Sequence, residues 1–174
     1  MEKISIFGVD IYNTTLKDTV ELLIEYLNGD TLKKIYTPNT EIVMVAKDDG
    51  DLRELLNRGD LVIPDGIGLI YGSKIQGKLL EIADANKYSL YLLGGKDGIA
   101  REAAKNISEE YPNIDIVGFH HGYFKGSHLG LKDSKEELAI IEEINDKKPD
   151  IIFVGFGFPK QEIWIDSNAH RLDS

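Results

Sequence analysis

Short apolar runs alternate along the chain with segments in which apolar residues recur every three to four positions. The runs are rich in Ile, Val, Leu, Phe and Tyr, which is typical of buried strands. They occupy residues 35–37, 61–64, 90–93, 114–119 and 151–156. The helical pattern occupies residues 16–27, 40–47, 51–58, 98–111 and 134–147. Strands that alternate with helices predict an α/β fold, a mostly parallel Rossmann-like sheet with helices on both faces.

Two of the expected helices begin at recognisable capping sequences. Thr15 precedes the first helix with Asp18 three residues later, and Ser134 precedes the last of them with Glu137 three residues later. Both have the spacing of a capping box. The 174 residues suit one ordinary domain, and no linker or repeat interrupts the pattern. We therefore expect a single domain over residues 1–174.

The composition is that of a globular protein, with 42% hydrophobic and 29% charged residues. The 20 basic and 30 acidic residues give a formal net charge of -10, which disfavours nucleic acids as partners. The absence of cysteine excludes disulfides, thiolate nucleophiles and cysteine-type zinc sites. No apolar run reaches the length of a membrane span, and no signal peptide is evident, so we expect a cytoplasmic location.

In an open parallel sheet, ligands bind beyond the carboxyl ends of the strands. Asn39 follows the expected strand at residues 35–37 and begins a helix, so it is either a polar side chain that contacts the substrate or a helix cap, or both. Asp65 follows the next strand between Pro64 and Gly66 and is the best candidate for a general base. Partial desolvation would raise the pKa of its carboxyl group. The alternative is that Asp65 is only a turn or capping residue.

Glycine-rich turns follow the expected strands at residues 90–93 and 151–156. The segment Gly94-Gly95-Lys96-Asp97-Gly98 could offer backbone N–H groups to a phosphate, or be a tight connection capped by Asp97. The segment from Gly155 to Gly157 leads into a helix that begins at Pro159. Gln161 and Glu162 lie in the first turn of that helix, where they could reach a ligand. Neither turn completes the dinucleotide fingerprint, which argues against an NAD site.

Two further polar clusters carry no predicted chemistry. His120 and His121 are adjacent on a strand, so we expect their side chains to point to opposite faces and not to share a metal ion. The acidic residues Glu136, Glu137, Glu142 and Glu143 have helical spacing and are expected to form a solvated face.

Together the strand-end segments form an ordered set that resembles the WecG/TagA/CpsF glycosyltransferase family. The resemblance covers nearly the whole chain, from residue 6 to residue 164, and is especially close to the TagA-type branch that acts in wall teichoic acid synthesis. The matching segments are Thr37-Pro38-Asn39-x-Glu41, Pro64-Asp65-Gly66-x-Gly68, Leu93-Gly94-Gly95 and Gly155-x-Gly157-x-Pro159-x-Gln161-Glu162-x-Trp164.

The resemblance implies an inverting transfer of N-acetylmannosamine from UDP-N-acetylmannosamine to the 4-hydroxyl of N-acetylglucosamine on undecaprenyl diphosphate. This is a committed step in building the teichoic acid linkage unit. It implies metal-independent catalysis without a cofactor, with Asp65 as the base. The implied substrate-binding residues are Thr37, Asn39, Gly94, Gly95, Gly157, Gln161 and Glu162.

Two departures from the family pattern stand out. The segment around residues 74–79 is shorter than usual and lacks an R-x-x-G-x-D pattern, and the chain ends at Ser174 without the family's basic C-terminal region. That region is implied to hold the enzyme at the inner face of the cell membrane. A homo-oligomer is compatible with the sequence. The competing interpretation is a non-catalytic nucleotide-binding or regulatory α/β module, in which Asp65 has no chemical role.

Overall fold

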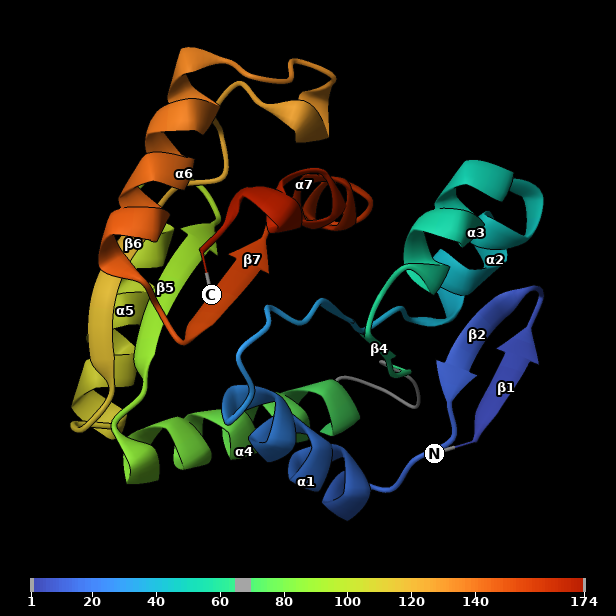
Figure 1. The fold of residues 1–174 in the computed structure, drawn as a ribbon, viewed down its shortest axis with the longest axis horizontal. Helices are drawn as coiled ribbons and strands as arrows, with labels where there is room; N and C mark the ends of the chain where they lie inside the picture. Colours follow the sequence, from blue (N-terminus) through green and yellow to red (C-terminus); the bar gives the residue numbers. More distant parts are fainter. Residues whose placement is uncertain (1, 65–69, 174) are drawn as a thin grey trace. The chain divides into compact units, whose positions relative to one another are not determined.

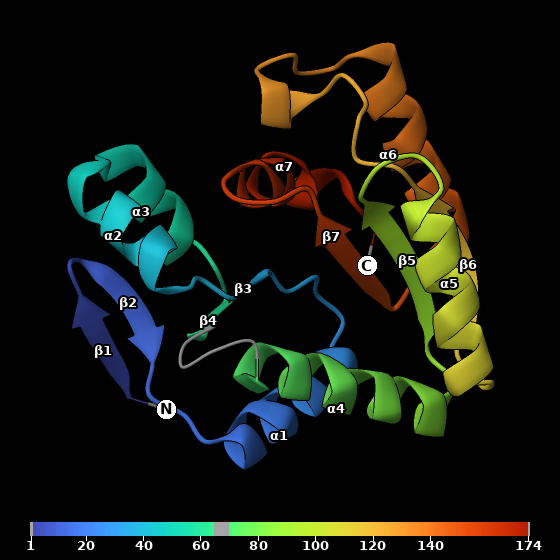
Figure 2. The ribbon, with the colours of Figure 1, turned by 180° about the vertical axis from the view of Figure 1, so that it is seen from behind.

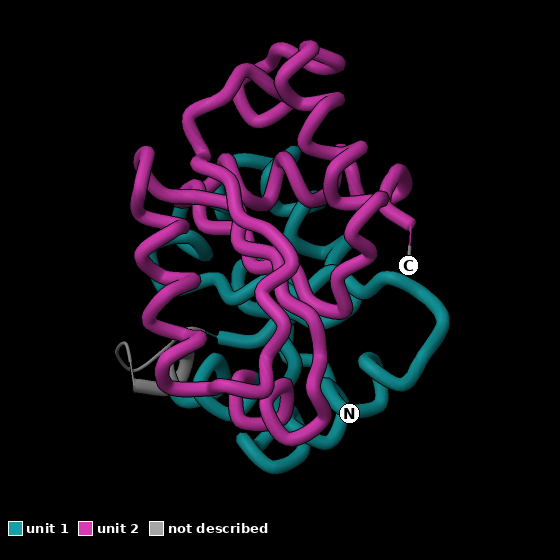
Figure 3. The backbone as a smooth tube through the Cα atoms, turned by 90° about the vertical axis from the view of Figure 1, so that its left-hand side faces the viewer, with its two compact units in different colours: residues 1–79 teal, residues 80–174 magenta. Residues whose placement is uncertain are grey.

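The computed structural model describes residues 2–64 and 70–173. The chain divides into two compact units, Met1–Leu79 and Leu80–Ser174 (Figure 3). Asp65, the predicted base, lies outside the described residues. That the two units form a single domain stays a prediction.

The first unit combines an antiparallel hairpin, a short parallel strand pair and helices (Figure 1). Its elements are β1 (Lys3–Ile6), β2 (Val9–Tyr12), α1 (Leu16–Leu27), β3 (Ile35–Tyr36), α2 (Thr40–Asp48), α3 (Gly50–Asn57) and β4 (Leu61–Val62). Strands β3 and β4 run parallel, with Ile35 paired to Leu61. The hairpin turns at Phe7 and Gly8, which both have positive φ. Asn57 holds this turn against α3, because its amide accepts from the Asp10 N–H and donates to the Gly8 carbonyl, each at 2.9 Å.

The predicted helix starts are confirmed. Thr15 and Asp18 form a capping box at α1. Asn39 caps α2, since its side-chain oxygen accepts from the Ile42 N–H at 2.9 Å. Ser134 caps the helix that follows it by accepting from the Glu137 N–H at 3.1 Å. Each cap satisfies a backbone donor that the helix itself leaves unpaired.

The second unit is built on the parallel sheet β6-β5-β7. The chain enters it through α4 (Ile70–Asn86), and the remaining elements are β5 (Ser89–Gly94), α5 (Ile99–Glu110), β6 (Asp115–His120), the 3-10 turn η1 (Ser127–Leu129), α6 (Lys135–Lys147), β7 (Ile151–Gly155), α7 (Lys160–Asn168) and the 3-10 turn η2 (Ala169–Arg171). Residues 74–79, where the family pattern is shortened, lie inside α4, so the chain passes them as continuous helix.

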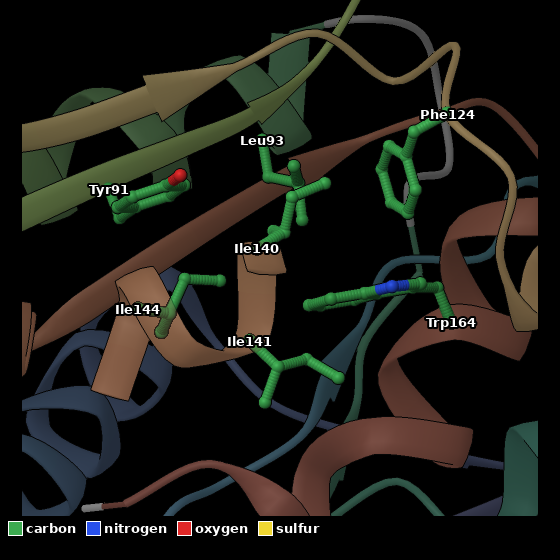
Figure 4. Packing of buried hydrophobic residues seen from close by; sticks show 7 residues of the cluster. All are labelled: Tyr91, Leu93, Phe124, Ile140, Ile141, Ile144 and Trp164. Carbon is green, nitrogen blue, oxygen red and sulfur yellow. The ribbon is translucent and has the colours of Figure 1, made fainter. Parts of the chain in front are cut away.

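Helices cover both faces of this sheet. Successive residues of a strand point to opposite faces. Tyr91 and Leu93 of β5 share one face, where they pack with Ile140 and Ile144 of α6 and Trp164 of α7 (Figure 4). Helix α5 lies on the opposite side of the sheet from α6 (Figures 1 and 2). The predicted α/β class, with parallel strands flanked by helices, is confirmed.

Among the described residues, no helix has both the length and the apolar character needed to cross a membrane.

Candidate functional site

The loops that follow β5, β6 and β7 are joined by backbone hydrogen bonds at the carboxyl edge of the sheet. The Gly95 N–H donates to the Gly155 carbonyl at 3.0 Å, and the Gly122 N–H donates to the Gly95 carbonyl at 2.9 Å. Gly94 has φ of 154°, and a Cβ atom there would lie 2.4 Å from the Gly155 oxygen. A side chain at Gly94 would therefore push the β5 and β7 turns apart, which explains why this position is glycine.

Two glycines of these turns have open space on the side where other residues carry a Cβ atom. Gly98 and Gly157 have φ of 88° and 78°, and a Cβ atom at either would meet nothing within 4 Å. Gly98 caps α5, and no side chain hydrogen-bonds to the start of this helix. The alternative in which Asp97 caps this helix is therefore wrong, because the N-cap residue is the left-handed Gly98. A helix start that has no side-chain cap and lies next to open backbone suits an anion such as a diphosphate.

The turn from β7 into α7 fixes the orientation of Gln161. Its side-chain oxygen accepts from the Gly157 N–H at 3.2 Å, and its amide nitrogen donates to Glu162 Oε1 at 2.9 Å. Glu162 is 2% exposed, and its Oε2 has no hydrogen-bond partner within the described residues. Burial raises the pKa of Glu162, while hydrogen bonds from its own backbone and from Gln161 oppose this. The predicted placement of both residues in the first turn of α7 is confirmed, and their contact with a donor stays a prediction.

A buried histidine that the sequence did not indicate lies behind these turns. The His128 ring is 5% exposed and packs against Phe124 and Phe156, with ring centroids 4.7 and 4.8 Å away. Burial lowers the pKa of His128 and the Lys160 charge adds to this, although the Glu137 carboxylate opposes them. The ring is thus held neutral between the loops after β6 and β7. His128 has no sequence neighbours that mark it as buried, which is why the pattern missed it.

Glu137 is not part of a solvated face, contrary to expectation. Its side chain is fully buried, and its Oε1 accepts from both the N–H and the hydroxyl of Ser127, at 2.8 and 2.6 Å. Oε2 accepts from the Asp133 N–H at 3.0 Å, and Asn168 of α7 donates to Oε1 at 3.2 Å. Glu137 lies in the first turn of α6, where the side chain folds back over the incoming loop. It therefore joins that loop to α6 and α7.

Replacing Glu137 with glutamine is expected to destabilise the fold by about 1–3 kcal/mol, because the new amide donor would face the Asp133 N–H. Burial raises the pKa of Glu137, but its hydrogen bonds outweigh this and the net pKa is lowered from 4.5. The ionised Glu137 carboxylate therefore contributes its full stabilisation of the fold above pH 4.5. This stabilisation is lost as the pH falls through the lowered pKa of Glu137 in the folded state. Urea unfolding from pH 7 down to pH 3 measures it, with the exposed Glu142→Gln on the same helix as control. Equal losses in both variants at pH 7 would contradict the assigned role.

The two adjacent histidines do not point to opposite faces. Their ring centroids lie 4.3 Å apart, and both rings line one cavity of about 510 Å³. His120 is the last residue of β6, so strand alternation ends before His121. Within the part of the chain that the structure describes, no three His, Asp or Glu side chains are grouped to hold a metal ion.

The first unit carries the other predicted site residues. Thr37 and Pro38 follow β3, and Asn39 caps α2 as described. Pro38 and Asn39 border a small, mostly apolar pocket of about 140 Å³, to which Phe7, Met44 and Pro64 contribute. The capping interpretation of Asn39 is confirmed, and its role in reading substrate stays a prediction. The relation of Thr37 and Asn39 to Asp65 lies outside the described residues.

Comparison with known proteins points to the same family that the sequence motifs resemble. A family model described as the glycosyl transferase WecG/TagA/CpsF family matches residues 4–174. Two Staphylococcus aureus proteins, from strains NCTC 8325 and COL, are each 31% identical to the chain over 188 aligned residues. Each alignment covers 99% of this chain and 70% of the relative. Both relatives are named N-acetylglucosaminyldiphosphoundecaprenol N-acetyl-beta-D-mannosaminyltransferase.

Proposed function

The chain belongs to the WecG/TagA/CpsF glycosyltransferase family, and from this membership we propose that it transfers N-acetylmannosamine to N-acetylglucosamine on undecaprenyl diphosphate. The observation that carries the proposal is the similarity over 99% of the chain to relatives named for this reaction. UDP-N-acetylmannosamine is the proposed donor. The product is a lipid-linked disaccharide of the kind that begins a teichoic acid linkage unit.

The proposed sugar transfer requires few catalytic groups from the protein. Inversion at the anomeric carbon is a single displacement, so it needs a base for the acceptor hydroxyl and no protein nucleophile. Asp65 is the proposed base, with Thr37 and Asn39 orienting the sugar or the acceptor. The departing UDP gains negative charge, which backbone N–H groups and helix starts can stabilise. We propose that the donor is bound by two glycine turns and by two side chains at the start of α7. The turns contain Gly94, Gly95 and Gly157, and the side chains are those of Gln161 and Glu162.

We propose that no metal ion takes part. Asp49 and Asp51 have the Asp-x-Asp spacing that can hold a metal ion on a diphosphate. In the structure, however, Asp49 caps α3, and its carboxylate accepts from the Leu52 N–H at 3.0 Å. This structural role supports the proposal that charge on UDP is balanced by the protein alone.

The site of action follows from the acceptor. An undecaprenyl chain keeps its sugar at a membrane surface, so we propose that the enzyme works as a peripheral protein at the inner face of the cell membrane. In family members that carry the basic C-terminal region, its binding to anionic lipid is the proposed means of attachment.

Calorimetric titration with UDP in the presence of EDTA tests the nucleotide site. We expect UDP to bind in the micromolar range, where a dissociation constant of about 1 μM corresponds to roughly -8 kcal/mol. AMP and NAD are the comparison ligands, since the glycine turns lack a dinucleotide fingerprint. Tight binding of NAD, or no binding of UDP, would contradict the proposed donor site.

A further inference from the structure

The backbone fixes the tautomers of His120 and His121 in opposite senses. His120 Nδ1 lies 2.8 Å from the His121 carbonyl oxygen, which can only accept, so Nδ1 carries the proton. His121 Nδ1 lies 3.2 Å from the Tyr123 N–H, which can only donate, so this nitrogen is the acceptor. In the neutral rings, His120 Nε2 is therefore an acceptor and His121 Nε2 is a donor.

Both Nε2 atoms lack a hydrogen-bond partner among the described residues. The half-buried rings lie at a centroid distance of 4.3 Å and are tilted by 47° to each other. They thus present one acceptor and one donor side by side. A ligand that matches this pair has an N–H group next to a carbonyl group.

The cavity that the two rings line suits a flat, neutral group. Tyr123 and Phe124 add aromatic surface, and Ile140 adds an apolar side chain. The carboxylates of Glu136 and Glu143 also line it, so a phosphate inside the cavity would meet like charge. The cavity volume of about 510 Å³ is larger than the volume of a single planar ring.

The cavity adjoins the turns proposed for the diphosphate. Gly122, the residue after His121, donates its N–H to the Gly95 carbonyl at 2.9 Å. A Cβ atom on Gly122 would lie 3.3 Å from Gly94 Cα and 2.7 Å from the Phe156 ring. A nucleotide whose diphosphate lies at the glycine turns therefore has its base within reach of this cavity.

Resting on the proposed function, we infer that His120 and His121 read the uracil ring of the donor nucleotide. Uracil N3–H donates to His120 Nε2, and the C4 carbonyl of uracil accepts from His121 Nε2–H. Cytosine has an unprotonated N3 and an amino group at the same edge, so both contacts become repulsive. The pair thereby selects UDP over CDP.

The test is calorimetric titration of the whole chain and its variants with UDP and with CDP. The unaltered chain is expected to bind UDP about tenfold or more tightly than CDP, the discrimination typical of a paired hydrogen-bond contact. His120→Ala and His121→Ala are each expected to bring this ratio close to one. His120→Gln keeps an acceptor at a similar reach and is expected to retain a preference for UDP. His170→Ala, an exposed histidine of the same unit, is the matched control and should keep the full ratio.

The outcomes separate this inference from the function on which it rests. An unchanged ratio in both alanine variants, with UDP still bound, would overturn base reading and leave the transferase proposal intact. Failure of the unaltered chain to bind UDP would overturn both. Circular dichroism of each variant distinguishes a lost contact from a lost fold, and His120→Gln provides the comparison if an alanine variant unfolds.

Discussion

Replacing Asp65 with asparagine is expected to lower the rate of sugar transfer by about 10²–10⁴-fold, the contribution usual for a general base. Asparagine has nearly the same size and cannot accept a proton from the acceptor hydroxyl. The affinity for UDP should stay unchanged, because the proposed nucleotide turns belong to another part of the chain. Release of UDP from UDP-N-acetylmannosamine in the presence of a lipid-linked acceptor measures the rate, and calorimetry measures the affinity.

Asp51→Asn is the matched control for this experiment. Asp51 is an exposed carboxylate in the first turn of α3, with the same Asp-x-Asp spacing discussed above. We expect this variant to keep full activity. If Asp65→Asn also keeps full activity, the chain acts without this base, and a turn role for Asp65 is the better interpretation. UDP binding by a chain that transfers no sugar would favour the non-catalytic nucleotide-binding module.

Gly94→Ala is expected to lower both stability and UDP affinity. The added Cβ atom would lie 2.4 Å from the Gly155 oxygen, at a φ of 154° that L residues rarely adopt. Steric overlap and backbone strain together are expected to cost about 3 kcal/mol of unfolding free energy. For a chain of this size that corresponds to a decrease of roughly 10 °C in Tm. Thermal unfolding followed by circular dichroism measures the decrease.

Gly77→Ala is the control for a glycine substitution. Gly77 lies inside α4, where a Cβ atom would meet nothing within 4 Å. Alanine is the better helix former, so this variant should be as stable as the parent or slightly more so. If Gly94→Ala unfolds at the parent temperature and binds UDP normally, the close contact between the β5 and β7 turns does not shape the site.

Periodicity and capping predicted the strands and helices of the α/β pattern, but not the hairpin β1–β2 or helix α4. The expected helix at residues 16–27 coincides with α1, and the expected strands at 90–93 and 151–156 lie on β5 and β7. These elements are predictable because their apolar spacing and their caps are local in sequence. The glycine turns were equally visible, since the need for positive φ is a property of a single residue.

The parts that escaped prediction depend on contacts between distant residues. Glu137 has the spacing of a surface residue, yet Ser127 and Asn168 supply donors that make its burial favourable. The shared cavity of His120 and His121 arises because β6 ends between them. His128 is buried by Phe156, which lies on another loop. None of these neighbours can be inferred from spacing along the chain.

The most direct test of the proposed function is to incubate the chain with UDP-N-acetylmannosamine and N-acetylglucosaminyl diphosphoundecaprenol, in EDTA, and to analyse the lipid products by mass spectrometry. We expect a lipid heavier by one N-acetylhexosamine, formed together with UDP and formed equally well without divalent metal. Donor that remains intact beside acceptor, or product that forms only when a metal ion is restored, would contradict this expectation.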